Sequence, residues 1–510
     1  MEVSMLQIIA NVFTPLNILM AAGGVVLGII FGALPGFTAA MGIAILMPFT
    51  FSLDPAAGLI MMGALFAGAM WGGAVSAILI NTPGTPGAAA TVLDGYPMAK
   101  QGRASEALRE SIFSSFVGGM LGIMVLMLFA PPLARISLMF GPPEYFMLAL
   151  FGMTIIASLS EKMVIKGFIS GFLGLSIATI GMDPLLGIPR FTFGVPHMVD
   201  GIQLVPALIG LFSIPEIMEI IQTHGEKVER IPSLKNIKIG FPPLSHIKKM
   251  TPTYLRSSLI GLIAGMLPGA GASIASFMAY NEERRASKTP EKFGTGMIEG
   301  VAASEAANNS VCAGAFIPML TLGVPGDSVA AIMMGGLMVH GLQPGNALFT
   351  VHAEITWTFI FSLYLANILM LLFGTYCAPW FSAVTDTPRH ILAVSVVLLT
   401  TVGSFALRGS MFDVYVMLFF GIIGYLLKSH GFDVVPVVLG IILGPMAEKG
   451  LNGTLAISYG QNTLWFILQR PVCLVLLALI AISLMIPIIR SRNKGNDIFS
   501  APHGPDADEL

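Results

Sequence analysis

Proline–glycine pairs interrupt long apolar segments at related places in the two halves of the chain. Residues 28–36 read G-I-I-F-G-A-L-P-G and residues 261–269 read G-L-I-A-G-M-L-P-G, so all three glycines and the proline match at a constant offset of 233 positions. A second pair of interruptions follows, at residues 84–87 in the first half and 323–326 in the second. Proline removes a backbone donor and glycine weakens a helix, so the sequence predicts unwound backbone at all of these places.

The composition indicates that the interruptions lie in a membrane protein. Of the 510 residues, 55% are hydrophobic and only 11% are charged, against about 25% charged in an ordinary soluble domain. The runs are continuously apolar and not alternating, which argues against a transmembrane barrel. We expect an all-α polytopic membrane protein with about 10–14 transmembrane helices of ~20 residues each. The clearest apolar runs are 16–34, 56–80, 112–130, 357–378, 393–407 and 465–489.

Broken or re-entrant helices occur within the membrane only in particular surroundings. Unwound backbone is tolerated there only where protein buries it or where it lines a watery cavity. Two such breaks in each of two related halves are typical of secondary transporters, whose binding site lies between the repeats. The sequence therefore predicts a transporter-like site built from these interruptions.

The basic residues of the loops predict that the halves are inverted repeats. Residues 100–109, after the second interruption of the first half, carry three Lys or Arg, whereas the corresponding residues 340–347 carry none. The loop after the first interruption has the opposite bias, since residues 48–55 carry none and residues 281–292 carry four. Lys and Arg mark cytoplasmic loops, so we expect equivalent loops on opposite sides of the membrane.

The same rule sets the expected domain boundaries. Residues 226–256 hold seven Lys and Arg side chains and are expected to be a cytoplasmic connector. It joins a first transmembrane repeat, 1–225, to a second repeat with C-terminal scaffold helices, 257–489. Basic residues after position 489 place the C-terminus in the cytoplasm, and the polar residues 490–510 are expected to form a disordered tail. Nothing in the charge pattern suggests nucleic acid.

The first interruption of each half is a candidate anion site. A helix that restarts after the break presents free backbone N–H groups and the positive end of its dipole, which suits a carboxylate. Kinked helices packed through small residues are the alternative, because G-x-x-x-G is also a close-contact motif. The substrate-binding candidates here are Pro35, Gly36, Thr38, Pro268, Gly269, Gly271 and Ser273.

The second interruptions differ in their chemistry. The first-half copy offers neutral donors and acceptors and adds the substrate-binding candidates Asn81, Thr82, Gly84, Thr85 and Gly87. The second-half copy adds a carboxylate, and exposed carbonyls with Asp327 are a candidate Na⁺ site, because hard cations take oxygen ligands. Helix capping by Asp327 and Ser328 is the alternative role. The cation-coupling candidates of this segment are Gly323, Pro325, Gly326, Asp327 and Ser328.

An acidic residue also lies within an apolar stretch upstream. Glu305 is three to four residues before Asn308 and Asn309, so the three share one helical face. A carboxylate inside a membrane segment is costly and indicates function, here ion coupling or proton exchange. Hydration at the membrane interface is the alternative.

Several stretches resemble the large membrane subunit of the tripartite tricarboxylate transporters, the TctA-like family. The resemblance extends over nearly the whole chain and weakens after about residue 355. The matching stretches are G-A-L-P-G-F-T-A-A-M-G (32–42), N-T-P-G-T-P-G-A-A-A-T-V-L-D-G-Y-P-M-A (81–99), Q-G-R-A-S-E-A-L (101–108), G-M-L-P-G-A-G-A-S-I-A-S-F (265–277), E-A-A-N-N (305–309) and L-G-V-P-G-D (322–327).

This resemblance implies a bacterial inner-membrane symporter for citrate or a related di- or tricarboxylate, driven by Na⁺ or protons. The implied partners are a small membrane subunit of about four helices and a periplasmic solute-binding protein. A homo-oligomer of the chain is also compatible with the resemblance. No cofactor is expected beyond the coupling cation. Two other classes are alternatives: an anion-permeable channel, which uses similar broken helices, and an intramembrane serine hydrolase. Ser273 lacks the sequence context of a hydrolase nucleophile, so we expect no enzyme.

Overall fold

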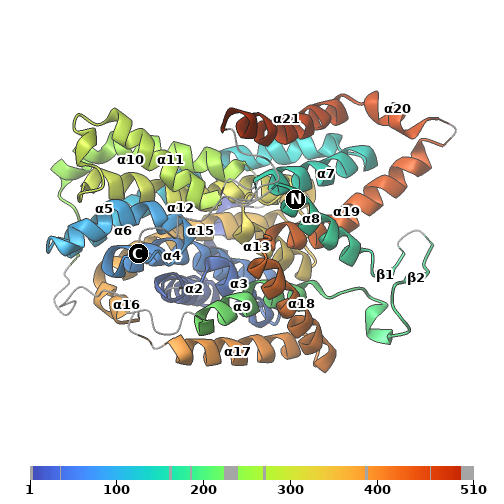
Figure 1. Ribbon diagram of the computed structural model, residues 1–510, viewed down its shortest axis with the longest axis horizontal. Helices are drawn as coiled ribbons and strands as arrows, with labels where there is room; N and C mark the ends of the chain where they lie inside the picture. The colour runs from blue at the N-terminus through green and yellow to red at the C-terminus, as the bar shows by residue number, and fades with distance from the viewer. Residues whose placement is uncertain are drawn as a thin grey trace. The chain divides into compact units, whose positions relative to one another are not determined.

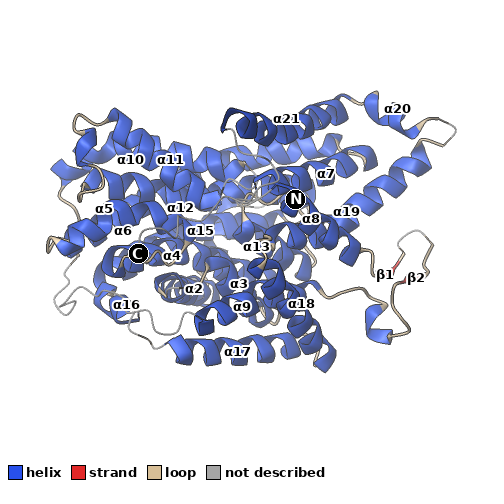
Figure 2. Cartoon of the chain, in the orientation of Figure 1, coloured by secondary structure: helices blue, strands red, loops and turns tan. Residues whose placement is uncertain are grey.

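The computed structural model describes residues 4–34, 36–159, 164–183, 186–222, 239–267, 271–384, 387, 389–459 and 461–494. Helices make up almost all of this part of the chain, as Figure 2 shows. The only strands that these residues form are β1 (Gly181–Met182) and β2 (Pro189–Arg190), which pair antiparallel. The expected all-α fold is confirmed.

By its internal packing the chain divides into two compact units. The first comprises residues 1–137 and 212–414, and the second comprises residues 138–211 and 415–510. The chain passes between the units within η2 (Ser137–Met139), α9 (Leu204–Gln222) and α18 (Met411–Ser429). This division concerns compactness. The expected division into a first repeat, 1–225, a connector and a second repeat, 257–489, concerns internal similarity and stays a prediction.

The first unit contains two successive sets of helices, each with the order long, short, long, short, long. In the first set, α2 and α4 each begin with a proline after a capping side chain, which suits the first turn of a helix. The elements are α1 (Met5–Val12), α2 (Pro15–Ala33), α3 (Ala39–Thr50), α4 (Pro55–Ile80), η1 (Pro86–Ala88), α5 (Ala89–Lys100), α6 (Ala104–Ile136) and the 3-10 turn η2 (Ser137–Met139).

The second set repeats this order, with the five-residue α14 added before its last long helix, and is followed by two further helices. Its first helix, α10, begins at Leu244, inside the stretch expected as the connector, and residues 223–238 lie outside the described residues. The elements are α10 (Leu244–Met266), α11 (Gly271–Ala286), η4 (Pro290–Lys292), α12 (Ile298–Leu322), α13 (Ser328–Val339), α14 (Asn346–Thr350), α15 (Ala353–Tyr376), α16 (Ala378–Val384) and α17 (Arg389–Ala406).

The second unit is a smaller group of helices with the β1–β2 hairpin. Glu144 joins two of its helices, because its carboxylate accepts from the Gly141 N–H at 2.8 Å and pairs with Arg470 at 3.1 Å. The remaining elements are α7 (Pro142–Leu159), α8 (Val164–Ala178), η3 (Pro196–Met198), α19 (Val435–Ile457), α20 (Thr463–Leu468) and α21 (Pro471–Lys494).

The two sets of helices in the first unit are interrupted in the same way. The first interruption of each follows a leucine in extended conformation, Leu34 (φ −85°, ψ 118°) and Leu267 (φ −87°, ψ 112°). The second follows a residue in the left-handed region, Asn81 (φ 57°) and Gly323 (φ 72°). Left-handed residues end helices, and asparagine and glycine tolerate that conformation best. The predicted breaks are confirmed as ends and restarts of helices.

The alignment of the second interruptions needs a correction. The sequence pairs residues 84–87 with 323–326, because both contain Pro-Gly. The structure instead equates residues 81–85 with 323–327, since α4 ends at Ile80 and α12 ends at Leu322. The shift is three residues and arises because Pro-Gly occurs twice in the first-half copy. In the corrected alignment Thr85 is the counterpart of Asp327, and each is the N-cap of the following helical segment.

Glycines bring the first two long helices of each set into close contact. A Cβ at Gly32 on α2 would collide with the carbonyl oxygen of Ala69 on α4. At the equivalent crossing, a Cβ at Gly265 on α10 would lie 2.6 Å from the carbonyl oxygen of Val311 on α12. One turn earlier, Gly28 lies in the same way against α4 and Gly261 against α12. The G-x-x-x-G pairs are therefore backbone-contact residues in both sets.

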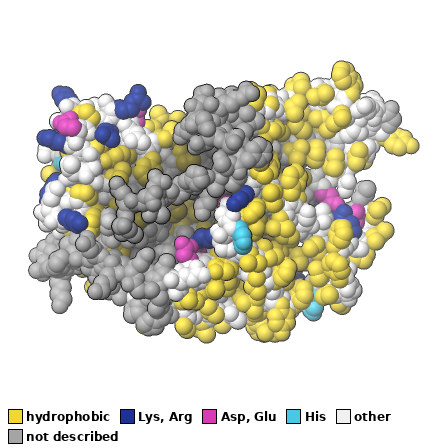
Figure 3. Space-filling model, viewed as in Figure 1, with side chains coloured by type: hydrophobic (Ala, Val, Ile, Leu, Met, Phe, Trp, Pro, Cys, Tyr) yellow, Lys and Arg dark blue, Asp and Glu magenta, His cyan; other side chains and the backbone are white. Residues whose placement is uncertain are grey.

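The basic clusters of the two sets lie together. Figure 3 shows charged side chains gathered at the edge of the molecule where Figure 1 places α5, α10 and α11. Gln101, next to Lys100, donates to the Thr295 carbonyl at 2.7 Å, and Arg103 donates to that of Gly296 at 3.2 Å. The loop after α5 thus contacts the loop after α11.

The chain has six helices long and apolar enough to cross a membrane, among the described residues. They are Pro15–Ala33, Pro55–Ile80, Ala104–Met139, Leu204–Gln222, Ala353–Tyr376 and Met411–Ser429, and shorter apolar helices accompany them. These lengths identify a multi-pass membrane protein.

One sequence expectation about local structure is wrong. The apolar run 465–489 is not one helix, because it is divided at Gln469 and Arg470 between α20 and α21. The segment Asp94-Gly95-Tyr96-Pro97 has the composition of a turn but lies within α5. Asp94 is fully buried there.

The close crossing of α2 and α4 makes a prediction with a matched control. Gly28→Ala places a methyl group against the backbone of Leu65 and Ala69, whereas nothing lies within 4 Å of a Cβ at Gly23 on the same helix. Overpacking should cost Gly28→Ala about 1–3 kcal/mol of unfolding free energy. Gly23→Ala should be neutral or stabilising by up to ~1 kcal/mol. Thermal unfolding in detergent measures both, and equal shifts would contradict the close crossing.

Candidate functional site

α12 lies at the centre of the first unit. Every residue from Gly300 to Thr321 is buried, and Figure 1 shows the helix running beside α6 and α10. Glycines permit this approach on both sides: a Cβ at Gly118 of α6 would collide with the Ala306 carbonyl, and one at Gly261 of α10 with the Ala307 carbonyl. A polar group on this part of α12 is therefore shielded from water and lipid by its neighbours.

Glu305 occupies this position and is fully buried. Its Oε1 accepts a hydrogen bond from the Thr91 hydroxyl of α5 at 2.5 Å, and its Oε2 accepts one from the Ser115 hydroxyl of α6 at 2.9 Å. Thr91 also shares a 2.9 Å hydrogen bond with Ser304. No ion pair reaches Glu305 from the described part of the chain.

Two neighbouring buried acids are better compensated. Asp94 accepts from the backbone N–H groups of Gly294, Gly296 and Met297 and from the Tyr280 hydroxyl, all within 2.9 Å. Glu110 accepts from Tyr254 at 2.7 Å and contacts His246 at 2.7 Å. Glu305 accepts from two hydroxyl groups and no backbone amide or cation in the described part of the chain, and a buried carboxylate without a cation costs several kcal/mol. The geometry of Glu305 therefore favours a neutral carboxyl group or a nearby cation.

Asn308 lies one turn beyond Glu305 and links α12 to the second interruption of the first set. Its Nδ2 donates to the Met70 carbonyl of α4 at 3.0 Å. Its Oδ1 is buried, has no partner among the described residues, and lies where a Cβ at Gly87 would collide with it. The hydroxyl of Thr85 is likewise buried and unpartnered, beside Gly73 of α4. Two unused oxygens therefore lie at the second interruption of the first set, one against Gly73 of α4 and one against Gly87.

Some of the residues predicted at the first interruptions lie in the described part of the chain. Thr38 is the N-cap of α3, and its hydroxyl accepts from the Met41 N–H at 3.1 Å. Gly36 has a φ of 84° and Gly271, at the start of α11, has a φ of 61°. Ser273 lies in the first turn of α11. Pro35, Pro268 and Gly269 lie outside the described residues.

The second interruptions pack against the helices that precede the first ones. A Cβ at Gly84 would collide with the Gly32 carbonyl, and one at Gly326 with the Gly265 carbonyl. Asp327 caps α13, because its Oδ1 accepts from the Ala330 N–H at 2.7 Å, and Ser328 is the first residue of that helix. The remaining predicted residues here, Asn81, Thr82, Gly323 and Pro325, form the turns that lead into these contacts.

The interruptions of the two sets also meet each other. A Cβ at Gly87 would lie 2.8 Å from the Cβ of Ala272, at the start of α11. α3 packs against α13, so the other two interruptions also lead into neighbouring helices. The structure thus brings the interrupted segments together in two pairs, η1 with α11 and α3 with α13.

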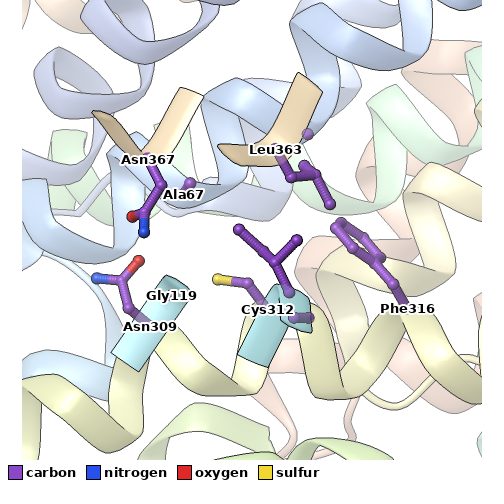
Figure 4. Close-up of a pocket in the computed structure, with 10 residues that line it drawn as sticks. Ala67, Gly119, Asn309, Cys312, Phe316, Leu363 and Asn367 are labelled. Atoms are coloured by element: carbon purple, nitrogen blue, oxygen red, sulfur yellow. The ribbon is translucent and has the colours of Figure 1, made fainter. Parts of the chain in front are cut away.

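Asn309 faces a different direction from Asn308 and lines a small cavity with Asn367 of α15. In Figure 4 the two amide groups point toward each other, with Cys312, Leu363 and Phe316 beside them. The Asn367 Nδ2 donates to the Phe116 carbonyl at 2.8 Å. The Asn309 Nδ2 and the Asn367 Oδ1 are buried without a partner in the described structure.

Sequence reasoning missed three residues of this site. Thr91, Ser115 and Asn367 come from α5, α6 and α15, which are far from Glu305 in sequence. Hydroxyl-rich residues 111–115 in an otherwise apolar helix, and a lone amide in the apolar run 357–378, were the available signals. Neither indicates a partner without the fold.

The fold and the site define a multi-pass membrane protein with broken helices around a buried carboxyl group, the class to which secondary transporters belong. Residues 18–439 match the model of the tripartite tricarboxylate transporter TctA family. The chain belongs to that family, and a tripartite system implies further subunits.

Two relatives from Agrobacterium vitis are also similar. The chain is 35% identical over 487 residues to an uncharacterized 52.8 kDa protein in the TAR-I ttuC' 3' region, covering 95% of this chain and 96% of the relative. It is 33% identical over 240 residues to an uncharacterized protein in the TAR-II ttuC' 3' region, covering 47% of this chain and 98% of that relative. No solved structure matches.

The hydrogen bond from Ser115 to Glu305 can be measured by a double-mutant cycle. Ser115→Ala should cost about 1–3 kcal/mol, because a buried carboxyl loses one of its two donors. In a Glu305→Leu background the same change should cost close to nothing. Ser114→Ala is the control, since its hydroxyl donates only to backbone oxygens. Free energies of unfolding in mixed micelles provide the values, and an equal cost of Ser115→Ala in both backgrounds would remove this bond from the account.

Proposed function

We propose that this chain imports citrate or a related di- or tricarboxylate together with a coupling cation, Na⁺ or a proton. The observation that carries the proposal is Glu305, a fully buried carboxyl group with two hydroxyl partners. Such a group is costly to keep charged. An ion that neutralises it in one state and leaves in another can therefore be coupled to a change of conformation.

The interrupted segments are the proposed place for the substrate. α3 and α11 each begin directly after an interruption, so their first N–H groups are available to an anion. Thr38 and Ser273 lie at these helix starts, and Gly87 packs against Ala272, next to Ser273. Two helix starts from different sets suit a substrate with more than one carboxylate.

The coupling cation is proposed to act at α12. Glu305 and Asn308 contribute oxygens there, and Thr85 adds an unused hydroxyl. Asp327 is the counterpart of Thr85 in the second set and offers a second oxygen site at the start of α13. The Asp327 carboxylate also caps α13, so capping and ion binding share that side chain, whereas the Thr85 hydroxyl makes no capping bond.

The packing of the loops supports an inverted relation between the two sets. The loop after α5 contacts the loop after α11, although these are not equivalent positions. α3 likewise packs against α13, and a Cβ at Gly58 in α4 would lie 2.7 Å from His340 after α13. A two-fold axis in the membrane plane produces such contacts between non-equivalent elements of the two sets. We propose that a bundle of helices derived from the repeats moves against a fixed scaffold of the remaining helices. This motion exposes the site alternately to each side of the membrane.

The basic loops are proposed to face the cytoplasm of a bacterium, which places the chain in the inner membrane with a cytoplasmic C-terminus. A periplasmic binding protein would then deliver the carboxylate to the opposite side. The other proposed partners are the small four-helix membrane subunit and further copies of this chain.

Uptake into vesicles tests the transporter against the channel. Proteoliposomes that contain the chain with its small subunit, and that receive the binding protein, should accumulate labelled di- or tricarboxylate above the outside concentration. A membrane potential of 100 mV supplies roughly 2.3 kcal/mol per charge, which corresponds to about a fiftyfold gradient. Uptake should saturate and should require an imposed Na⁺ or proton gradient. Flux that neither saturates nor concentrates the substrate would indicate a channel.

A further inference from the structure

The cavity between Asn309 and Asn367 is not explained by substrate binding. It lies where α4, α6, α12 and α15 meet, and its volume is about 20 Å³. Gly63, Ala67 and Gly119 leave the space open, and a Cβ at Gly119 would lie 2.7 Å from the Asn367 amide. A cavity volume of at least ~10–15 Å³ is needed to hold a water molecule. The space is therefore large enough for one.

The polar atoms around the cavity also suit water. The Asn309 Nδ2 can donate and the Asn367 Oδ1 can accept, and both are buried and unpartnered in the described structure. An unsatisfied buried amide costs about 1–3 kcal/mol, which a bridging water would recover. A metal cation fits less well, because hard cations take six or more oxygens and no carboxylate lines the cavity.

The cavity lies close to Glu305 along two helices. Asn309 follows Glu305 by four residues on α12, and Gly119 follows Ser115 by four residues on α6, a rise of about 6 Å in each helix. Ser115 is itself the donor to Glu305. One further water between the cavity and the carboxyl group would complete a hydrogen-bonded chain.

Other titratable groups near Glu305 already have their own partners. Asp94 on α5 is held by backbone amides and Tyr280 of α11, and Glu110 on α6 is held by Tyr254 and His246 of α10. Asp327 caps α13 through the Ala330 N–H, and the Cys312 thiol lines the cavity itself. Among these groups, Glu305 is the acid that lies one turn from Asn309 of the cavity lining, on the same face of α12.

We propose that the cavity between Asn309 and Asn367 binds water and that this water delivers protons to Glu305, so that the coupling ion is a proton. A hydronium ion gives up one O–H bond, a carboxylate oxygen of Glu305 gains one, and neutral water remains. The reverse step discharges the carboxyl group, and no electrons are transferred. This inference rests on the proposed function, because it names the ion that neutralises Glu305.

Infrared spectroscopy of the purified protein tests the inference without a substrate. The difference between wild type and Glu305→Gln should show the band of a protonated carboxyl group, and the band should shift in deuterated water. Asn367→Leu removes the amide, and Ala67→Val fills the cavity while both amides stay. Each should slow the deuterium exchange of the band by about tenfold or more, the factor expected when the water loses a polar partner or its space.

Thr358→Val is the matched control. Thr358 is on the same helix as Asn367, about 13 Å away along its axis, and its hydroxyl is also buried and unpartnered. It should leave the exchange unchanged. Absence of a protonated Glu305 band, or wild-type exchange in both cavity variants, would overturn the inference. Carboxylate accumulation driven by Na⁺ alone would also overturn it and leave the proposed transport intact, whereas failure to accumulate any carboxylate would refute the proposed function.

Discussion

The burial of one carboxyl group is the constraint on which the rest of this molecule depends. Glu305 lies in the most enclosed part of α12, and the described structure offers it two hydroxyl donors and no cation. Removing a charge from water costs several kcal/mol unless it is paired. A group that serves packing alone would be better replaced by an apolar side chain. Its presence supports the proposal that an ion binds there and leaves.

The enclosure itself is built by small residues at helix crossings. Gly118 and Gly261 let α6 and α10 approach the backbone of α12, and Gly28 and Gly32 do the same between α2 and α4. Gly28 and Gly32 in the first set correspond to Gly261 and Gly265 in the second. The interrupted segments that follow these close contacts therefore start from equivalent positions in the two sets. The breaks, the crossings and the buried carboxyl group are thus parts of one arrangement.

Local chemistry explains what could be predicted from the sequence. Proline and glycine act on their own backbone, so the interruptions were predictable, as was the all-α membrane fold. The alignment of the second interruptions was three residues off, because a repeated Pro-Gly gives two equally good matches and only the helix ends distinguish them. Glu305 was visible as an acid in an apolar stretch. Its partners Thr91 and Ser115 were not, since they lie 214 and 190 positions away and only packing brings them together.

Transport by the Glu305→Gln variant tests the central claim most directly. Glutamine keeps the shape and the hydrogen bonds of a neutral carboxyl group but cannot gain or lose an ion. The variant should therefore exchange labelled for unlabelled carboxylate across a vesicle membrane at a rate near that of wild type. It should fail to accumulate carboxylate against a gradient under any imposed ion gradient. Gradient-driven accumulation equal to wild type in this variant would contradict the account.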